Sequence, residues 1–262
     1  MAELMRSKRG LVMGVANDRS IAWGIARALA EEGAELAFSF QGEAFGKRVA
    51  PLAASVGSDL LVDVDVTDEA SLDAAFETLR ARWGRMDFLI HAIAYSDKNE
   101  LHGRFIHTSR ANFKHSLDVS CYSFIDVSRR AAEMMPEGGS LVTLTYGGSN
   151  RVTPFYNVMG VAKAALEASV RYLANDLGPQ GVRVNAISPG PMKTLAGAAI
   201  GGARKTYRFT EANAPLRRNA TLESVGGAAV FLCSDYGACT TGDVIMVDSG
   251  YHVLGMPQPE NI

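Results

Sequence analysis

Short apolar segments alternate along the chain with longer segments whose apolar residues recur at helical spacing. Ser20–Glu32 and Ser71–Trp83, for example, each gather their apolar residues on one face of a helix. Nearly continuous apolar strands separated by such helices are typical of a parallel sheet that is covered on both faces. The pattern predicts seven strands: Gly10–Met13, Glu35–Phe40, Asp59–Asp63, Met86–Ala92, Ser140–Tyr146, Arg183–Ile187 and Asp243–Val247.

Seven strands in this order predict an α/β fold with a single, doubly wound domain over residues 1–262, in which helices flank a seven-stranded parallel sheet. One segment, at about 191–215, breaks the pattern because it is rich in Gly and Ala and weakly periodic. A flexible segment in this place is a candidate lid over a binding site. We expect this lid at about residues 192–210.

Composition narrows the class of protein. The 262 residues are 47% hydrophobic and carry a net charge of −2, so a basic nucleic-acid-binding domain is not expected. No apolar run reaches the ~18 residues that span a bilayer, and the N-terminus lacks the features of a secretory signal. Neither the three cysteines nor the five histidines have metal-ligand spacing. We therefore expect a cytoplasmic protein with free thiols, no metal site, and no nucleic-acid or membrane partner.

Ligands of open parallel sheets bind at the carboxyl ends of the strands, so residues that follow the strands are candidates for function. The first such turn, GVANDRSIAWG at 14–24, lies where a dinucleotide-binding fold holds phosphates, but it lacks the G-x-G-x-x-G fingerprint. We expect backbone N–H groups between Gly14 and Ser20 to face the phosphates, Ser20 to cap the next helix, and Gly24 to pack closely on the sheet. The other candidates are Gln41, Asp65, Val66, Ile93–Ser96, Tyr146 and Ser188–Thr194.

A second informative segment runs from Tyr146, at the end of a strand, to Lys163. Tyr156 and Lys163 are seven residues apart, which on a helix gives a rise of about 10.5 Å and a drift of about 20°, so we expect one shared face. An ammonium beside a phenol favours the phenolate and strengthens the phenol as a donor to an oxyanion. Taken singly, Tyr156 also fits a packed aromatic and Lys163 a solvated charge. Their combination with Tyr146 and the first turn favours a site.

Three motifs carry a resemblance that covers essentially the whole chain. The first is G-x5-S-x-A-x-G from Gly14, the second is Y-x6-K from Tyr156 to Lys163, and the third is VRVNAISPGPMKTLA at 182–196. The commoner Y-x3-K pattern fails, because Met159 stands four residues before the lysine. The chain therefore resembles a divergent branch of the short-chain dehydrogenase/reductase superfamily, the bacterial NADH-dependent enoyl-[acyl-carrier-protein] reductases.

This resemblance implies a Rossmann-type fold, NADH (NAD+) as cofactor, and a role for each matching residue. It implies that the catalytic residues are Tyr146, Tyr156 and Lys163, and that the acyl substrate lies near Ser96, Tyr146, Tyr156 and Met159. From the phosphates and adenosine to the nicotinamide, it implies cofactor contacts with Gly14, Ser20, Ile21, Gln41, Asp65, Val66, Ile93, Lys163, Met192, Thr194, Leu195 and Ala196. Ala94 stands where the family commonly has Gly, which narrows the space beside the nicotinamide.

The implied reaction is reduction of the trans-2 double bond of an enoyl thioester on acyl carrier protein, with an enolate stabilised by Tyr156 and the cofactor ribose held by Lys163. The resemblance also implies a homotetramer, with which the apolar faces of Ala111–Met135 and Tyr156–Leu177 are compatible. An acidic carrier protein would need a basic docking surface. Five residues near the lid either form it or are solvated charges: Arg204, Lys205, Arg208, Arg217 and Arg218.

Two points stay open at this level. The second predicted strand is followed by the neutral Gln41 and the acidic Glu43, and Lys47 and Arg48 come later. No partner for a 2′-phosphate is therefore obvious, and NADH is favoured over NADPH. The competing functions are a carbonyl reductase or alcohol dehydrogenase of the same superfamily, and a catalytically silent dinucleotide sensor. The Y-x6-K spacing disfavours the first, and the presence of both tyrosines with the lysine disfavours the second.

Overall fold

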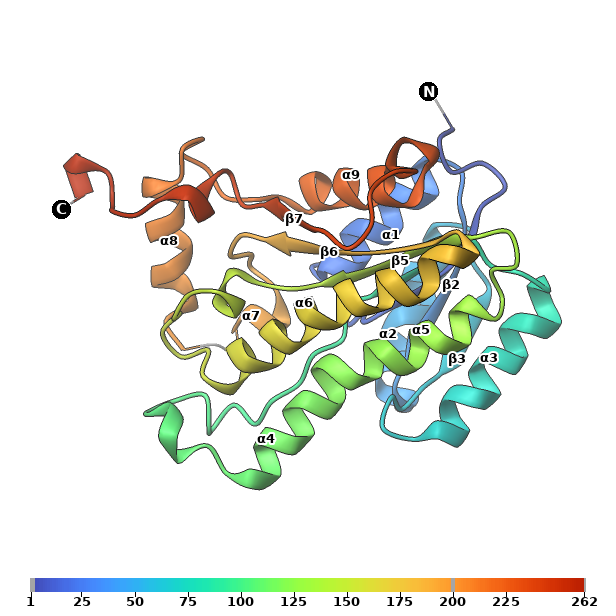
Figure 1. Ribbon diagram of the computed structural model, residues 1–262, viewed down its shortest axis with the longest axis horizontal. Helices are drawn as coiled ribbons and strands as arrows, with labels where there is room; N and C mark the ends of the chain where they lie inside the picture. Colours follow the sequence, from blue (N-terminus) through green and yellow to red (C-terminus); the bar gives the residue numbers. More distant parts are fainter. Residues whose placement is uncertain (1–2, 199–200, 262) are drawn as a thin grey trace.

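One sheet of seven parallel strands forms the centre of the computed structural model, which describes residues 3–198 and 201–261 (Figure 1). The strand order is β3-β2-β1-β4-β5-β6-β7. Successive strands are added on one side of β1 up to β3 and on its other side from β4, so the switch point lies between β1 and β4. The predicted fold class is confirmed, and every predicted strand is present with its ends within two residues. The observed bounds are β1 Arg9–Met13, β2 Glu35–Phe40, β3 Leu60–Asp63, β4 Phe88–His91, β5 Gly139–Leu144, β6 Val182–Pro189 and β7 Val244–Val247.

Helices cover both faces of the sheet, as buried apolar strands require (Figure 1). One face packs against α1 (Ile21–Glu31), α2 (Gly42–Ser55) and α9 (Leu222–Cys233). The other face packs against α3 (Glu69–Trp83), α5 (Ser123–Ala132) and α6 (Val158–Leu177). The helices predicted at 20–32 and 71–83 are thus α1 and α3, on opposite faces.

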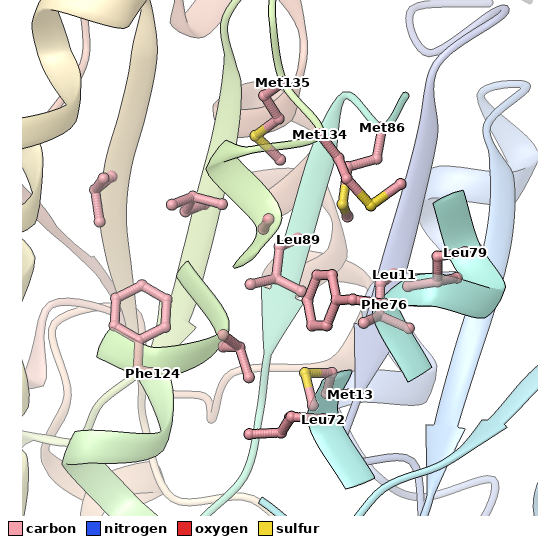
Figure 2. Close-up of a cluster of buried hydrophobic side chains, with 14 of the residues drawn as sticks. Leu11, Met13, Leu72, Phe76, Leu79, Met86, Leu89, Phe124, Met134 and Met135 are labelled. Atoms are coloured by element: carbon pink, nitrogen blue, oxygen red, sulfur yellow. The ribbon is translucent and has the colours of Figure 1, made fainter. Parts of the chain in front are cut away.

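The second of these faces shows how the strands are fixed. Phe76 and Leu72 of α3 lie against Leu11 and Met13 of β1 and Leu89 of β4, all of them buried (Figure 2). Each such side chain contributes about 1.5–3 kcal/mol when removed from water. This packing holds β1 and β4 side by side, and the turns that follow these two strands open at the same edge of the sheet.

Gly24 has a different role from the one expected. A side-chain carbon at Gly24 would lie 2.7 Å from Cβ of Leu222 in α9, and one at Gly226 would lie 3.0 Å from the carbonyl oxygen of Gly24. The close packing is therefore between two helices and not between α1 and the sheet. The reason is that α1 and α9 lie side by side on one face, and small residues let their backbones approach.

The edge of the sheet where the strands end carries the remaining elements (left in Figure 1). A five-residue π-helical turn, Asp118–Tyr122, joins α4 (Arg110–Leu117) to α5. The proposed lid segment holds α7 (Leu195–Ala198) and α8 (Ala203–Asn213), two helices that its weak periodicity did not predict; residues 199–200 lie outside the described part of the chain. In the ranges 3–198 and 201–261, no helix has the length and apolar character needed to cross a membrane.

Candidate active site

The turn after β1 depends on Gly14. Its φ is +99°, a backbone conformation that side chains other than glycine rarely allow, and an added Cβ would lie 2.2 Å from the carbonyl oxygen of Ala92. Ala92 follows β4, so the turns of these neighbouring strands meet here. Glycine is required at this position because two backbones approach each other closely at the switch point.

Ser20 does not cap α1 as expected. It is the residue before the helix, but its Oγ accepts hydrogen bonds from the backbone N–H groups of Ala16 and Asn17, both at 3.0 Å. Two N–H groups expected to face the phosphates are therefore already bonded within the turn. The first N–H groups of α1, starting at Ile21, have no partner within the helix, and the first turn of α1 contains no acidic residue. The positive end of α1 is what the turn offers to an anion.

The ends of β2 and β3 bring Gln41 and Asp65 together. The Asp65 carboxylate accepts hydrogen bonds from the backbone N–H of Thr67 at 2.9 Å and from its hydroxyl at 2.7 Å. These bonds lower the pKa of Asp65, and the side chain of Gln41 adds to the effect. Val66 packs against the core below. This edge therefore holds a carboxylate that stays charged and can accept hydrogen bonds from an adenosine.

The cations nearest to this edge are already engaged. Lys47 Nζ pairs with Glu43 Oε1 at 2.6 Å, and the guanidinium of Arg48 lies 5.7 Å from the ring centre of Phe45. Both pairs are formed within α2. The two cations that follow β2 in the sequence therefore each have a partner within α2.

The loop after β4 is fixed from the helix that covers it. Ser120, in the π-helical turn, accepts from the N–H of Tyr95 at 3.0 Å and lies 3.1 Å from its carbonyl oxygen. Ser96 Oγ lies 3.3 Å from the Asn112 side-chain oxygen on α4. Ile93 packs against the core, while Ala94 is exposed. The sequence reasoning missed Ser120, because a π-helical turn has no recognisable spacing, and Asn112, because its contact with Ser96 joins two separate elements.

Tyr146 and Tyr156 lie edge to face, with ring centres 5.1 Å apart and planes at 65°. Tyr156 is 6% exposed, and burial raises its pKa well above the usual range, with smaller contributions from Tyr146 and Glu167. Lys163 is not among the groups that shift it. Tyr156 therefore stays protonated and is a hydrogen-bond donor, and burial, not the ammonium of Lys163, dominates its pKa.

Lys163 is also buried, with 5% of its surface exposed. Its Nζ donates to the carbonyl oxygen of Leu144 at 2.7 Å; Leu144 is the last residue of β5, two residues before Tyr146. Burial lowers the pKa of Lys163 to about 8, partly offset by Cys121 and Glu167. No carboxylate of the described residues forms an ion pair with it. Two of its three N–H donors therefore remain for a ligand.

The two residues do not share a helix face in the way the spacing suggested. α6 begins at Val158, so Tyr156 lies in the turn before the helix, and Asn157 between them has φ 39°. Met159 packs with Tyr156 and Leu101 in a small buried cluster. The long Tyr–Lys spacing is therefore a consequence of a turn, and only Lys163 is presented by the helix.

His91 is a buried polar residue that the sequence reasoning did not single out. Its ring nitrogens lie 3.0 Å from Thr143 Oγ1 and 2.9 Å from Ser123 Oγ. Burial, assisted by the charge of Lys163, lowers its pKa to about 3, so the ring is neutral. It joins β4, β5 and the start of α5 directly beneath the site.

The segment after β6 places the remaining predicted contacts. Met192 packs against the core, and Thr194 Oγ1 accepts from the N–H of Gly197 at 2.9 Å, which caps α7. Leu195 is 52% exposed, and Ala196 lies in the same short helix. These residues follow the carboxyl end of β6 and form the first part of the proposed lid segment.

Comparisons with known proteins agree with this geometry. The profile of the family described as Enoyl-(Acyl carrier protein) reductase matches residues 14–252. Enoyl-[acyl-carrier-protein] reductase [NADH] 2 of Rhizobium meliloti is 58% identical over 260 residues, 99% of this chain and 97% of that protein. The Anaplasma phagocytophilum reductase, crystallised in complex with NAD, is 53% identical with a TM-score of 0.96 over 98% of both chains. FabI of Candidatus Liberibacter asiaticus is 51% identical with a TM-score of 0.97, over 98% of this chain and 100% of that one.

Proposed function

The chain belongs to the enoyl-[acyl-carrier-protein] reductase family of the short-chain dehydrogenase/reductase superfamily, and from this premise we propose how its residues act. It is an NADH-dependent enoyl-[acyl-carrier-protein] reductase, which reduces the trans-2 double bond of an enoyl thioester in fatty-acid elongation. One observation carries the residue roles: Tyr156 is buried, protonated and packed against Tyr146. Tyr146 follows the end of β5, where the Leu144 carbonyl holds Lys163.

The residues present fit NADH. Gly14 lets the turn after β1 pass close to the turn after β4, and the N-terminus of α1 favours the pyrophosphate, next to Ser20 and Ile21. Gln41, Asp65 and Val66 would hold the adenosine. The nicotinamide end would contact Ile93, Lys163, Met192, Thr194, Leu195 and Ala196. Lys163 would bind the ribose hydroxyls with the two N–H donors that Leu144 leaves free.

When bound, NADH supplies the hydride that reduces the β carbon of the substrate. Tyr156 donates a hydrogen bond to the thioester oxygen, where negative charge develops as the enolate forms. Its raised pKa keeps this donor protonated throughout the physiological range. Protonation of the α carbon (C2) then gives the saturated thioester. Tyr146 holds the ring of Tyr156 from the side, and Ser96 and Met159 border the acyl chain. Burial of the pair excludes water, which strengthens the interaction with the oxyanion.

Tyr156→Phe tests this assignment with a nearly isosteric change. We expect kcat for crotonyl thioester reduction, followed by NADH oxidation at 340 nm, to fall about 10²–10³-fold, while NADH affinity by calorimetry changes little. Tyr146→Phe, which keeps the ring packing, is the matched control and should cost less. If the wild-type protein reduces ketones but not enoyl thioesters, it is a carbonyl reductase, and if it reduces neither substrate class, it is a dinucleotide sensor. Full activity of Tyr156→Phe would exclude the role assigned to Tyr156.

A basic surface on α8 suits an acidic carrier protein. Arg204, Lys205 and Arg208 are exposed, and the first two lie in the first turn, where the helix dipole disfavours cations. Arg218 is also exposed, whereas Arg217 lies 3.7 Å from Glu260. Because these cations do not stabilise the helix, their position favours a role in docking the carrier protein. Added salt should raise KM for carrier-bound substrate but not for a coenzyme A analogue; equal effects would exclude the docking surface.

The assembly we propose is a homotetramer of single-domain subunits, each with a lid at about 192–210. The helices α4 to α6 leave apolar residues on the surface, among them Phe113 and Tyr122, which line one hollow, and Tyr172. A second hollow beside it is lined by Ile125 and Leu173. Light scattering that gives the mass of one subunit would exclude the tetramer. Three free cysteines agree with the proposed cytoplasmic location.

A further inference from the structure

The backbone around Tyr156 is unusual on both sides. Phe155 has φ 63°, and Asn157 has φ 39° with ψ −120°. Asn157 thus lies far from the left-handed region near about φ +57°, ψ +47° that residues other than glycine occasionally visit. Such conformations persist only where the surroundings fix them, and they cluster at functional sites. Contacts outside α6 must therefore hold the backbone of residues 155–157 in this conformation.

The side chain of Asn157 provides this restraint. Asparagine before a helix normally accepts a hydrogen bond from the first turn, but within the described residues Asn157 makes no such cap on α6. Its Nδ2 instead faces three backbone carbonyls of one distant loop, at 3.1 Å from Leu101, 3.4 Å from Gly103 and 3.5 Å from Glu100. The amide ties the tyrosine turn to residues more than fifty positions earlier.

That loop is itself anchored on two sides. Leu101 is 4% exposed and packs in the same small cluster as Tyr156, Met159 and Tyr146. The Glu100 carboxylate accepts hydrogen bonds from the N–H and the hydroxyl of Ser109, which caps α4, both at 2.8 Å. The loop thus connects the start of α4 to the ring of Tyr156, and Asn157 closes the connection on the backbone side.

We propose that Asn157 is a positioning residue for enoyl reduction: its amide ties the strained turn to the 100–103 loop and so fixes the hydroxyl of Tyr156 relative to the substrate. This inference rests on the proposed function of Tyr156. Asn157 touches neither substrate nor cofactor in this role. Its removal should therefore lower kcat, while the affinity for NADH, which depends on Gly14, Lys163 and α1, stays within twofold of the wild type.

Two substitutions separate the tether from the backbone conformation. Asn157→Asp keeps the shape and the tolerance of positive φ but replaces both donors by an acceptor that faces three carbonyls. Asn157→Gly accepts the backbone without strain but has no tether. We expect kcat with crotonyl thioester to fall at least tenfold in Asn157→Asp and about threefold to tenfold in Asn157→Gly, since small misplacements of a reacting group are costly. Asn175→Asp, an exposed change on the same helix, should have no effect.

Hydrogen exchange gives a readout that does not depend on activity. The amides of residues 101–103 should exchange at least tenfold faster in both variants than in the wild type. Wild-type kcat in both variants, or a fall in kcat with unchanged exchange in the loop, would overturn the tether. Absence of enoyl reduction in the wild-type protein would instead overturn the proposed function, and the exchange rates would still decide whether Asn157 holds the loop.

Discussion

The two turns that form the site are built on opposite principles. The turn after β1 satisfies itself: Ser20 takes up the N–H groups of Ala16 and Asn17, and Gly14 supplies the one difficult backbone conformation. The turn around Tyr156 keeps two residues at positive φ, and a fully buried Lys163 stands beside it without an ion-pair partner among the described residues. The first turn uses Ser20 to satisfy its own backbone, whereas the second region leaves two N–H donors of Lys163 for a ligand.

This difference teaches where stability and function oppose each other. Polar groups in the cofactor turn contribute to folding, so their removal should destabilise the free protein. The buried charge beside the catalytic tyrosine costs folding free energy, so its removal should stabilise the free protein while impairing function. The two regions should therefore respond to substitution with opposite signs, which three variants test.

Gly14→Ala should have the largest effect. The new methyl group would lie 2.2 Å from the Ala92 carbonyl oxygen, and φ +99° is itself unfavourable for alanine. Because the methyl group would meet a backbone carbonyl and not the end of a flexible side chain, the contact cannot be relieved by a side-chain movement, and we expect a loss of ~3 kcal/mol or more in the free energy of unfolding. Urea denaturation measures this. Gly57→Ala is the control, because Gly57 also has positive φ but nothing lies within 4 Å; an equal loss there would assign the whole effect to φ.

Lys163→Met should raise the thermal stability of the free protein at pH 7. Burial lowers the pKa of Lys163 from 10.5 to about 8, which corresponds to a cost of about 3 kcal/mol for keeping the charge. The Leu144 carbonyl loses its hydrogen-bond donor in the variant, and this loss cancels about 1–2 kcal/mol of the gain from removing the buried charge. We expect a net gain of about 1–2 kcal/mol, together with weaker NADH binding. Differential scanning calorimetry and titration with NADH measure the two effects.

The pH dependence of this variant follows from the same shift. Below pH 8 the lysine is charged in both folded and unfolded protein, so the burial cost is fully present. Between pH 8 and 10.5 the unfolded chain binds a proton that the folded protein has lost, so the stability of the wild type rises with pH. The advantage of Lys163→Met should therefore shrink from pH 7 to pH 10. Lys205→Met, on the exposed surface of α8, should show no advantage at either pH.

The sequence was sufficient wherever a pattern is local. The strands are predicted to within two residues because buried parallel strands such as β1 and β4 contain unbroken apolar runs, at residues 11–13 and 88–90. Gly14 is predicted because the turn between β1 and α1 needs a residue that tolerates positive φ. The residue types of the site, two tyrosines and a lysine, are likewise visible in the spacing.

The details of the site depend on contacts between distant residues, and these have no spacing to read. Asn157 bends the chain before α6 because it bonds to the loop at 100–103, so Tyr156 could not be placed by helical periodicity. Ser120 reaches Tyr95 only because a π-helical turn rotates it there. The pKa of Tyr156 is set by burial and not by the nearby lysine, and burial is a tertiary property.

Ser20→Ala should have the smallest effect and the opposite sign to Lys163→Met. The N–H groups of Ala16 and Asn17 lose their acceptor, and since both residues are partly exposed, water replaces part of it. We expect a loss of about 1 kcal/mol in the free energy of unfolding. Ser55→Ala, which removes an exposed hydroxyl bonded to the Leu52 carbonyl, controls for loss of one surface hydrogen bond. If Ser20→Ala and Lys163→Met shift Tm in the same direction, the contrast between the two turns is wrong.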